Sequence, residues 1–161
     1  LTEVIENVEA YHKLNGGRTV LYNIETKTQP ITDGIYHPTP SDFVNTLMNV
    51  INGANISDRV IIQSFDFRTL QILHKRYPAI KTAALIEDYD KRSFEEQIKA
   101  LGFKPTIYSP HYSLVNKELI NKCHDQQIKV IPWTVNDKTK IDELKALGVD
   151  GIITDYPDLL K

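Results

Sequence analysis

A carboxylate and an ammonium group stand two residues apart at the end of an apolar segment near the start of the chain. Residues 21–27 read as a β-strand that ends in Glu25 and Lys27. Side chains at positions i and i+2 leave a strand on the same face, so we expect these two groups side by side. A carboxylate oxygen can ligate Mg²⁺ or Ca²⁺, while an ammonium group neutralises a phosphoryl oxygen. The pair alone is also compatible with a simple salt bridge, so its meaning depends on the rest of the chain.

The rest of the chain alternates between helix and strand patterns with little interruption. Apolar residues recur at helical spacing in six segments, and capping residues such as Thr39, Asp66 and Ser93 mark several of their starts. We expect helices over residues 2–14, 40–51, 67–77, 94–101, 114–126 and 138–147. We expect strands over residues 19–26, 59–65, 81–87, 105–109, 128–135 and 150–154.

Six strands, each separated from the next by one helix, require right-handed crossovers and therefore a parallel sheet. Most strands are apolar on both faces, as in residues 60–62 and 83–86, which is typical of a sheet covered by helices. The pattern predicts an α/β fold, and an open doubly wound sheet and an incomplete eight-stranded barrel both fit it. No glycine-rich turn of the kind that binds dinucleotides is present.

Ligands bind at the carboxyl ends of the strands in both architectures, so the residues there are the candidates for chemistry. These positions are rich in polar and aromatic side chains. They comprise Glu25, Lys27 and residues 63–65, 87–88, 109–111, 133–136 and 154–155. Of the five histidines, His37 and His111 fall in loops at this end of the sheet, and we expect none of the five to be catalytic.

The composition restricts the partners. With 19 basic and 21 acidic residues, the net charge of -2 provides no field that would attract nucleic acid or an anionic membrane. The single cysteine, Cys123, excludes an intrachain disulfide and a cysteine-based zinc site. No apolar run is long enough for a membrane span, and the first residues lack the features of a signal peptide. The chain has no initial Met and starts directly in a helix, so we expect its N-terminus to be cut.

Four segments resemble, in order, the motifs of the glycerophosphodiester phosphodiesterase family. They are Asn-Ile-Glu-Thr-Lys at 23–27, Gln-Ser-Phe-Asp at 63–66, Trp-Thr-Val-Asn at 133–136 and the run at 148–157. The resemblance spans nearly the whole chain and implies a TIM (β/α)8 barrel, present in part as strands three to eight with their helices. Residues 1–161 would form a single domain, the C-terminal portion of this barrel. The implied reaction is metal-dependent hydrolysis of glycerophosphodiesters to an alcohol and glycerol 3-phosphate.

The resemblance also implies roles for individual residues. Glu25 matches the family's metal-ligating glutamate, for Mg²⁺ or Ca²⁺, and Lys27 matches the lysine that contacts the phosphate. Trp133 matches the aromatic residue that lines the glycerol side of the pocket, and Phe65 would form a second apolar wall. Gln63 joins Lys27, Trp133 and Phe65 as a candidate for substrate binding.

The family's first two strands carry a His-Arg-Gly motif, a Glu-x-Asp metal pair and a further histidine, and none of these is found here. We therefore expect this chain alone to be inactive and to associate with the missing N-terminal barrel segment or with another chain. The small-molecule partner is a glycerophosphodiester, and the resemblance slightly favours a periplasmic or secreted location over the cytoplasm. Two alternatives remain open: a catalytically inactive, barrel-like binding module and an unrelated open-sheet α/β phosphate-binding domain.

Overall fold

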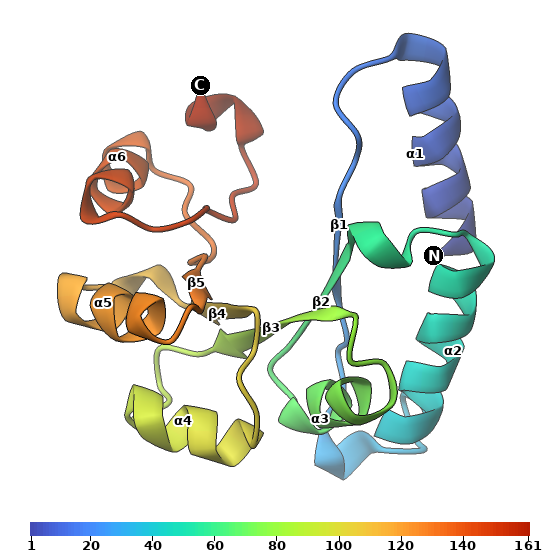
Figure 1. Ribbon diagram of the computed structural model, residues 1–161, viewed down its shortest axis with the longest axis horizontal. Helices are drawn as coiled ribbons and strands as arrows, with labels where there is room; N and C mark the ends of the chain where they lie inside the picture. Colours follow the sequence, from blue (N-terminus) through green and yellow to red (C-terminus); the bar gives the residue numbers. More distant parts are fainter. The chain divides into compact units, whose positions relative to one another are not determined.

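A computed structural model describes the whole chain, residues 1–161 (Figure 1). The chain folds into two compact units, Leu1–Lys81 and Thr82–Lys161. Parallel strands and helices alternate in both units, which confirms the predicted α/β fold.

The first unit contains one pair of parallel strands. These strands are β1 (Tyr22–Glu25) and β2 (Val60–Ser64). The helices are α1 (Thr2–Asn15), α2 (Pro40–Gly53) and α3 (Phe67–Arg76), with short 3-10 helices η1 (Pro30–Thr32) and η2 (Ser57–Arg59). The register places Glu25 directly opposite Gln63. Strand β1 pairs with β2 on one side and has no strand on its other side.

Local signals start the helices of this unit where the sequence predicts. The Thr39 hydroxyl accepts a hydrogen bond from the backbone N–H of Asp42 at the start of α2, and Pro40 occupies the first turn. Asp66 caps α3 in the same way by accepting from the N–H of Arg68. Helices α2 and α3 contact each other and supply, with β2, most of the apolar core. That core includes Val44, Leu47, Met48, Ile51, Ile62, Leu70 and Leu73.

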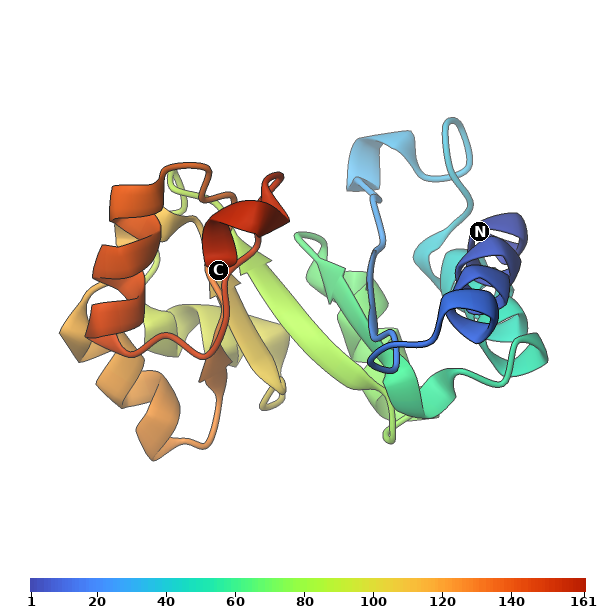
Figure 2. The ribbon, with the colours of Figure 1, turned by 90° about the horizontal axis from the view of Figure 1, so that it is seen from above.

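The second unit contains three parallel strands. These are β3 (Lys81–Ile86), which begins at the boundary, β4 (Ile107–Pro110) and β5 (Lys129–Val130). The helices are α4 (Phe94–Leu101), α5 (Lys117–Asp125) and α6 (Lys138–Leu147), with 3-10 helices η3 (Tyr112–Leu114) and η4 (Pro157–Leu160). The last helix, η4, contacts α6 (Figure 2). Its Leu159 packs against a buried cluster of Val135, Ile141 and Leu144.

The structure corrects two of the six predicted strands and confirms the six predicted helices with small shifts at their ends. The strand predicted at 128–135 is regular only at Lys129–Val130, and the one predicted at 150–154 is not a regular strand. Residues 150–154 are nevertheless held beside the chain that follows β5. The N–H of Asp150 donates to the Val130 carbonyl, and the N–H of Ile153 donates to the carbonyl of Pro132.

Two prolines explain why these ladders are interrupted. Pro132 has no N–H to donate toward residues 150–154, so a continuous parallel ladder cannot form there. Pro110, at the end of β4, likewise cannot donate to the chain that follows β5. The hydroxyl of Ser109 takes over this role and donates to the carbonyl of Ile131. The sequence contains both prolines but does not show which segment each one lies beside. The interruption of these two strands could therefore not be predicted.

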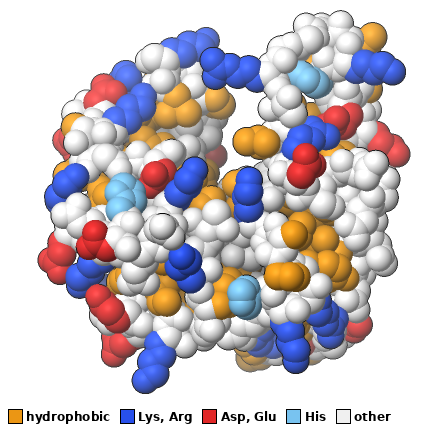
Figure 3. All heavy atoms as spheres, in the orientation of Figure 1, with side chains coloured by type: hydrophobic (Ala, Val, Ile, Leu, Met, Phe, Trp, Pro, Cys, Tyr) orange, Lys and Arg blue, Asp and Glu red, His pale blue; other side chains and the backbone are white.

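The surface combines charges of both signs with scattered apolar groups. Figure 3 shows Lys and Arg side chains interspersed with Asp and Glu on the drawn face, in keeping with the small net charge. Several large apolar side chains are exposed in the first unit, among them Leu14, Ile31, Ile35 and Tyr36. None of the helices has the length and hydrophobicity that a membrane-spanning segment needs.

Candidate functional site

Glu25 and Lys27 lie side by side at the carboxyl end of β1, as the i, i+2 spacing predicts. Oε2 of Glu25 lies 4.0 Å from Nζ of Lys27. The Glu25 side chain is 25% exposed, and that of Lys27 is 83% exposed. A pair this open to water is weak as a salt bridge. Both groups therefore remain available to an external ligand.

Gln63 joins this pair from the neighbouring strand. It is the register partner of Glu25, so their side chains leave the same face of the two strands. Its backbone carbonyl accepts from the N–H of Thr26 at 2.9 Å, which extends the strand pairing beyond Glu25. Its side-chain Oε1 accepts a 2.8 Å hydrogen bond from Nδ2 of Asn23. The first unit thus brings together Glu25, Lys27 and Gln63, three of the predicted site residues.

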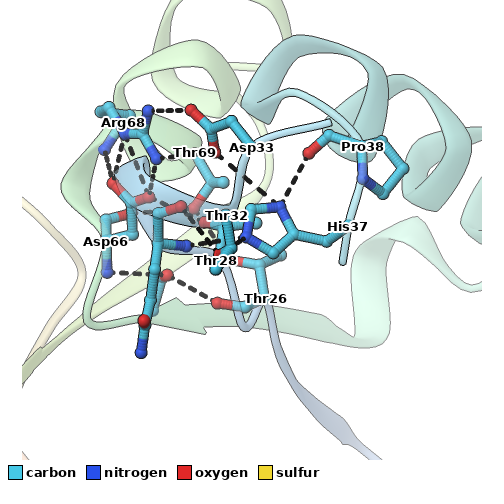
Figure 4. A network of polar contacts seen from close by, with 11 residues as sticks. Thr26, Thr28, Thr32, Asp33, His37, Pro38, Asp66, Arg68 and Thr69 are labelled. Atoms are coloured by element: carbon cyan, nitrogen blue, oxygen red, sulfur yellow. Dashed lines mark hydrogen bonds and ion pairs between the residues drawn. The ribbon is translucent and has the colours of Figure 1, made fainter. Parts of the chain in front are cut away.

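The opposite face of β1 is fixed by buried hydroxyl groups. The Thr26 and Thr69 hydroxyls are hydrogen-bonded at 2.8 Å (Figure 4). The Ser64 hydroxyl donates to the Thr26 carbonyl. Thr28, two residues further on, donates its hydroxyl to Asp66 at 2.8 Å. Because alternate residues are held in this way, Glu25 and Lys27 are directed to the other face.

An ion-pair network ties the loop after β1 to the start of α3. The guanidinium of Arg68 binds the carboxylates of both Asp66 and Asp33 (Figure 4). Burial alone would raise the pKa of the Asp66 carboxyl, but hydrogen bonds from Arg68 and Thr28 outweigh it and hold that pKa below its ordinary value. Hydrogen bonds to Asp66 and Asp33 raise the pKa of Arg68, so the guanidinium and the carboxylate of Asp66 stay charged.

His37, in the loop at this end of the sheet, has a structural role. Its Nε2 accepts from the backbone N–H of Gln29 at 3.0 Å, and Thr32 lies 2.8 Å from the same nitrogen. Its Nδ1 lies 2.9 Å from the carbonyl of Pro38, which can only accept, so Nδ1 carries the proton. Both ring nitrogens are therefore engaged in holding the loop.

Phe65 follows β2 directly and is 39% exposed. Its predicted role, as an apolar wall of a pocket, stays a prediction.

Trp133, in the second unit, is anchored at the ends of β4 and β5. Its indole Nε1–H donates to the carbonyl of Ser109 at 2.8 Å. The His111 ring meets it edge to face, with the ring centroids 5.3 Å apart. Nδ1 of His111 accepts from the N–H of Ser113, so this histidine also caps a turn. The indole thus has a fixed orientation beside an imidazole.

A surface hollow of about 420 Å³ is formed mainly by the residues that directly follow Trp133 in the sequence. It is lined by Tyr112, Thr134, Val135, Asn136, Asp137 and Lys140. Asn136 spans this region by donating to the Asp155 carboxylate at 2.8 Å and accepting from the Asp155 N–H at 2.9 Å. Asp155 is therefore engaged in the turn that precedes η4.

Sequence reasoning missed the part that Asn23 plays. Asn23, Glu25 and Lys27 alternate along one face of β1, and this spacing was the available signal. A metal ion needs several ligands, and no three carboxylate, histidine or cysteine side chains come together within the chain. Glu25 therefore offers one hard oxygen ligand but not a complete coordination shell.

Known structures give the class of fold to which this arrangement belongs. A crystal structure described as a glycerophosphoryl diester phosphodiesterase from Silicibacter pomeroyi matches 99% of this chain and 53% of its own, with a TM-score of 0.79 and 26% identity. An Oleispira antarctica phosphodiesterase in complex with the product sn-glycerol-3-phosphate matches 98% of this chain and 57% of its own, with a TM-score of 0.76 and 20% identity. The fold corresponds to part of a TIM barrel, which confirms the predicted fold class.

Sequence comparison then gives the family. The model of the glycerophosphoryl diester phosphodiesterase family matches residues 5–159. A glycerophosphodiester phosphodiesterase of Caldanaerobacter subterraneus is 31% identical over 158 residues, covering 98% of this chain and 61% of that protein. One from Bacillus altitudinis is 37% identical over 105 residues, covering 64% of this chain and 42% of that protein. The chain belongs to the glycerophosphoryl diester phosphodiesterase family and spans about half the length of its relatives.

Proposed function

We propose that this chain supplies part of an active site that hydrolyses glycerophosphodiesters to an alcohol and glycerol 3-phosphate. The observation that carries the proposal is the placement of Glu25, Lys27 and Gln63 on one face at the carboxyl ends of β1 and β2. Family membership and the phosphodiesterase names of the relatives support it. The sn-glycerol-3-phosphate complex of the Oleispira antarctica protein supports the choice of product.

Lys27 would bind a non-bridging oxygen of the phosphodiester and stabilise the negative charge that develops as water attacks. Its ammonium group is largely exposed and lies 4.0 Å from the adjacent carboxylate. Glu25 would contribute one ligand to a divalent cation, Mg²⁺ or Ca²⁺, in keeping with its hard oxygen atoms. The cation would polarise the phosphoryl group. We propose that its remaining ligands come from residues outside this chain.

Gln63, Phe65 and Trp133 would make further contacts with the substrate. Gln63 can hydrogen-bond an oxygen atom of the diester or of glycerol, because its amide lies on the face that carries Glu25. The exposed ring of Phe65 and the anchored indole of Trp133 offer apolar surfaces suited to the carbon skeleton of glycerol.

Hydrolysis also requires a general acid and a general base. Both nitrogens of His37 are engaged with the loop, and Nδ1 of His111 is used by a turn. We therefore propose that an N-terminal barrel segment, in the same protein or on another chain, completes the site.

The test uses the full-length protein that carries this chain, with glycerophosphocholine as substrate and Mg²⁺ or Ca²⁺ added after chelation. We expect cation-dependent release of glycerol 3-phosphate, and loss of that activity in Glu25→Gln with the fold retained. Glu143→Gln, on the exposed face of α6, is the matched control and retains activity. Binding of glycerol 3-phosphate without any turnover would instead favour the alternative of an inactive binding module.

A further inference from the structure

Asn23 is the third polar residue on the face of β1 that carries Glu25 and Lys27. Its Nδ2 donates a 2.8 Å hydrogen bond across the strands to Oε1 of Gln63. The register pairs Gln63 with Glu25, so the bond to Asn23 runs diagonally toward the beginning of β1. Asn23 is exposed in this chain, so packing in the apolar core does not determine which residue stands at this position.

In this hydrogen bond the oxygen of the Gln63 amide faces Asn23, so the amide nitrogen is the end left for a ligand. A glutamine side chain has one oxygen acceptor and one nitrogen that carries two donors. The oxygen is engaged by Asn23, whereas Nε2 makes no hydrogen bond within the chain. The group that Gln63 presents beside Glu25 and Lys27 is therefore a donor.

We infer that Asn23 is a positioning residue that keeps Gln63 as a hydrogen-bond donor to an oxygen of the bound phosphodiester. The inference rests on the proposed function and assigns to Asn23 a role that acts through Gln63. Phosphoryl oxygens accept hydrogen bonds, whereas a divalent cation binds oxygen ligands. In the opposite amide orientation, Oε1 of Gln63 would stand beside Glu25 and act as an additional cation ligand. Asn23 thus directs Gln63 toward the substrate and away from the cation.

The experiment measures two quantities in the full-length protein, KM for glycerophosphocholine and the cation concentration that gives half-maximal activity. Gln63→Ala is expected to raise KM about tenfold, the effect of one hydrogen bond to a charged group, with kcat and the cation requirement little changed. Asn23→Ala raises KM less, because the amide of Gln63 can then adopt both orientations. Asn23→Asp can only accept from Gln63, so it turns Oε1 outward, raises KM and changes the cation requirement.

A double mutant tests whether Asn23 acts through Gln63. Asn23→Ala is expected to have no further effect on KM once Gln63 is already Ala. Equal effects in both backgrounds would overturn the inference, as would an unchanged KM in Asn23→Asp. If Asn23→Ala fails to fold, Asn23→Asp, which preserves the side-chain shape, still gives the result.

Two further measurements separate this inference from the proposed function. If the wild-type protein hydrolyses glycerophosphocholine but the Asn23 variants behave like wild type, only the role of Asn23 is refuted. If the wild-type protein hydrolyses nothing and does not bind sn-glycerol 3-phosphate by calorimetry, the proposed function itself is refuted, and the role of Asn23 with it. Asn49→Ala, on α2, is the control for loss of an exposed asparagine and is expected to leave both quantities unchanged.

Discussion

Arg68 and Asp33 form a two-pronged ion pair, in which both terminal nitrogens of the guanidinium donate to the two carboxylate oxygens. Arg68 belongs to the first turn of α3, whereas Asp33 lies in the loop that begins with Lys27. Such paired hydrogen bonds fix geometry as well as adding energy. The loop that follows the candidate phosphate-binding lysine is therefore fastened to a helix.

Replacing Arg68 by Met is expected to loosen this loop. The change leaves the carboxylates of Asp33 and Asp66 without their cation and costs about 2 kcal/mol in the free energy of unfolding. Hydrogen exchange should show faster exchange of the backbone N–H groups of residues 29–37 in this variant. Arg76→Met, which removes a single hydrogen bond to Asn45, is the control. Unchanged protection of residues 29–37 would contradict the network's role.

Asp66 should make stability depend on pH. Because the folded state holds the pKa of this carboxyl below its ordinary value, the unfolded chain binds its proton more tightly. Ionised Asp66 therefore stabilises the fold fully above about pH 5, and this contribution is lost as the pH falls below about 4. The difference in unfolding free energy between wild type and Asp66→Asn, from urea titrations, should shrink over that range. A difference that stays constant over that range would contradict this role of Asp66.

Lys27→Ala is expected to lower kcat by ~10²-fold or more in the full-length protein, because it would remove the charge that we propose stabilises the transition state. Steady-state hydrolysis of glycerophosphocholine checks this. Lys13→Ala, at an exposed lysine of α1, should behave like wild type. Kinetics unchanged by Lys27→Ala would remove this residue from the site.

The chain in isolation, residues 1–161, is expected to hydrolyse no glycerophosphodiester. Glu25 is its one proposed cation ligand, and no three carboxylate, histidine or cysteine side chains come together in the chain, so we expect the acid, the base and most of the metal ligands to come from elsewhere. The measurement is release of glycerol 3-phosphate from glycerophosphocholine with Mg²⁺ or Ca²⁺ present. Cation-dependent turnover by this chain alone would show that the site needs no further segment.

Cys123 should resist alkylation while the protein is folded. Burial, together with the negative charge of Asp150, raises the pKa of its thiol to about 12, so very little thiolate exists near pH 8. Iodoacetamide labelling of the peptide that contains Cys123, followed by mass spectrometry, should be slow in buffer and fast in urea. Equal rates under the two conditions would show that the thiol is accessible.

The helices could be predicted because their signals are local. Thr39, Asp66 and Ser93 each cap a helix within three residues of their own position, and the structure places all three as caps. The two strands predicted after β4 could not be predicted correctly. Pro110 and Pro132 interrupt their pairing with neighbouring segments, and only the folded chain shows which segments are neighbours.

The features of the candidate site that are local in sequence could likewise be predicted, and those that join distant residues could not. The proximity of Glu25 and Lys27 follows from strand geometry alone, and the structure confirms it. The hydrogen bond between Asn23 and Gln63 joins residues 40 positions apart and depends on the register of β1 against β2, which the sequence does not specify. The same holds for the contact of Thr28 with Asp66.

Strand β1 has a partner on one side only. Its four residues, Tyr22–Glu25, therefore leave backbone donors and acceptors along the other side, in a form that can template intermolecular β-pairing. If this chain is produced alone, concentration-dependent self-association should begin at this strand, next to the residues proposed to bind substrate. The same segment that carries the chemistry would then also govern how the polypeptide behaves in solution.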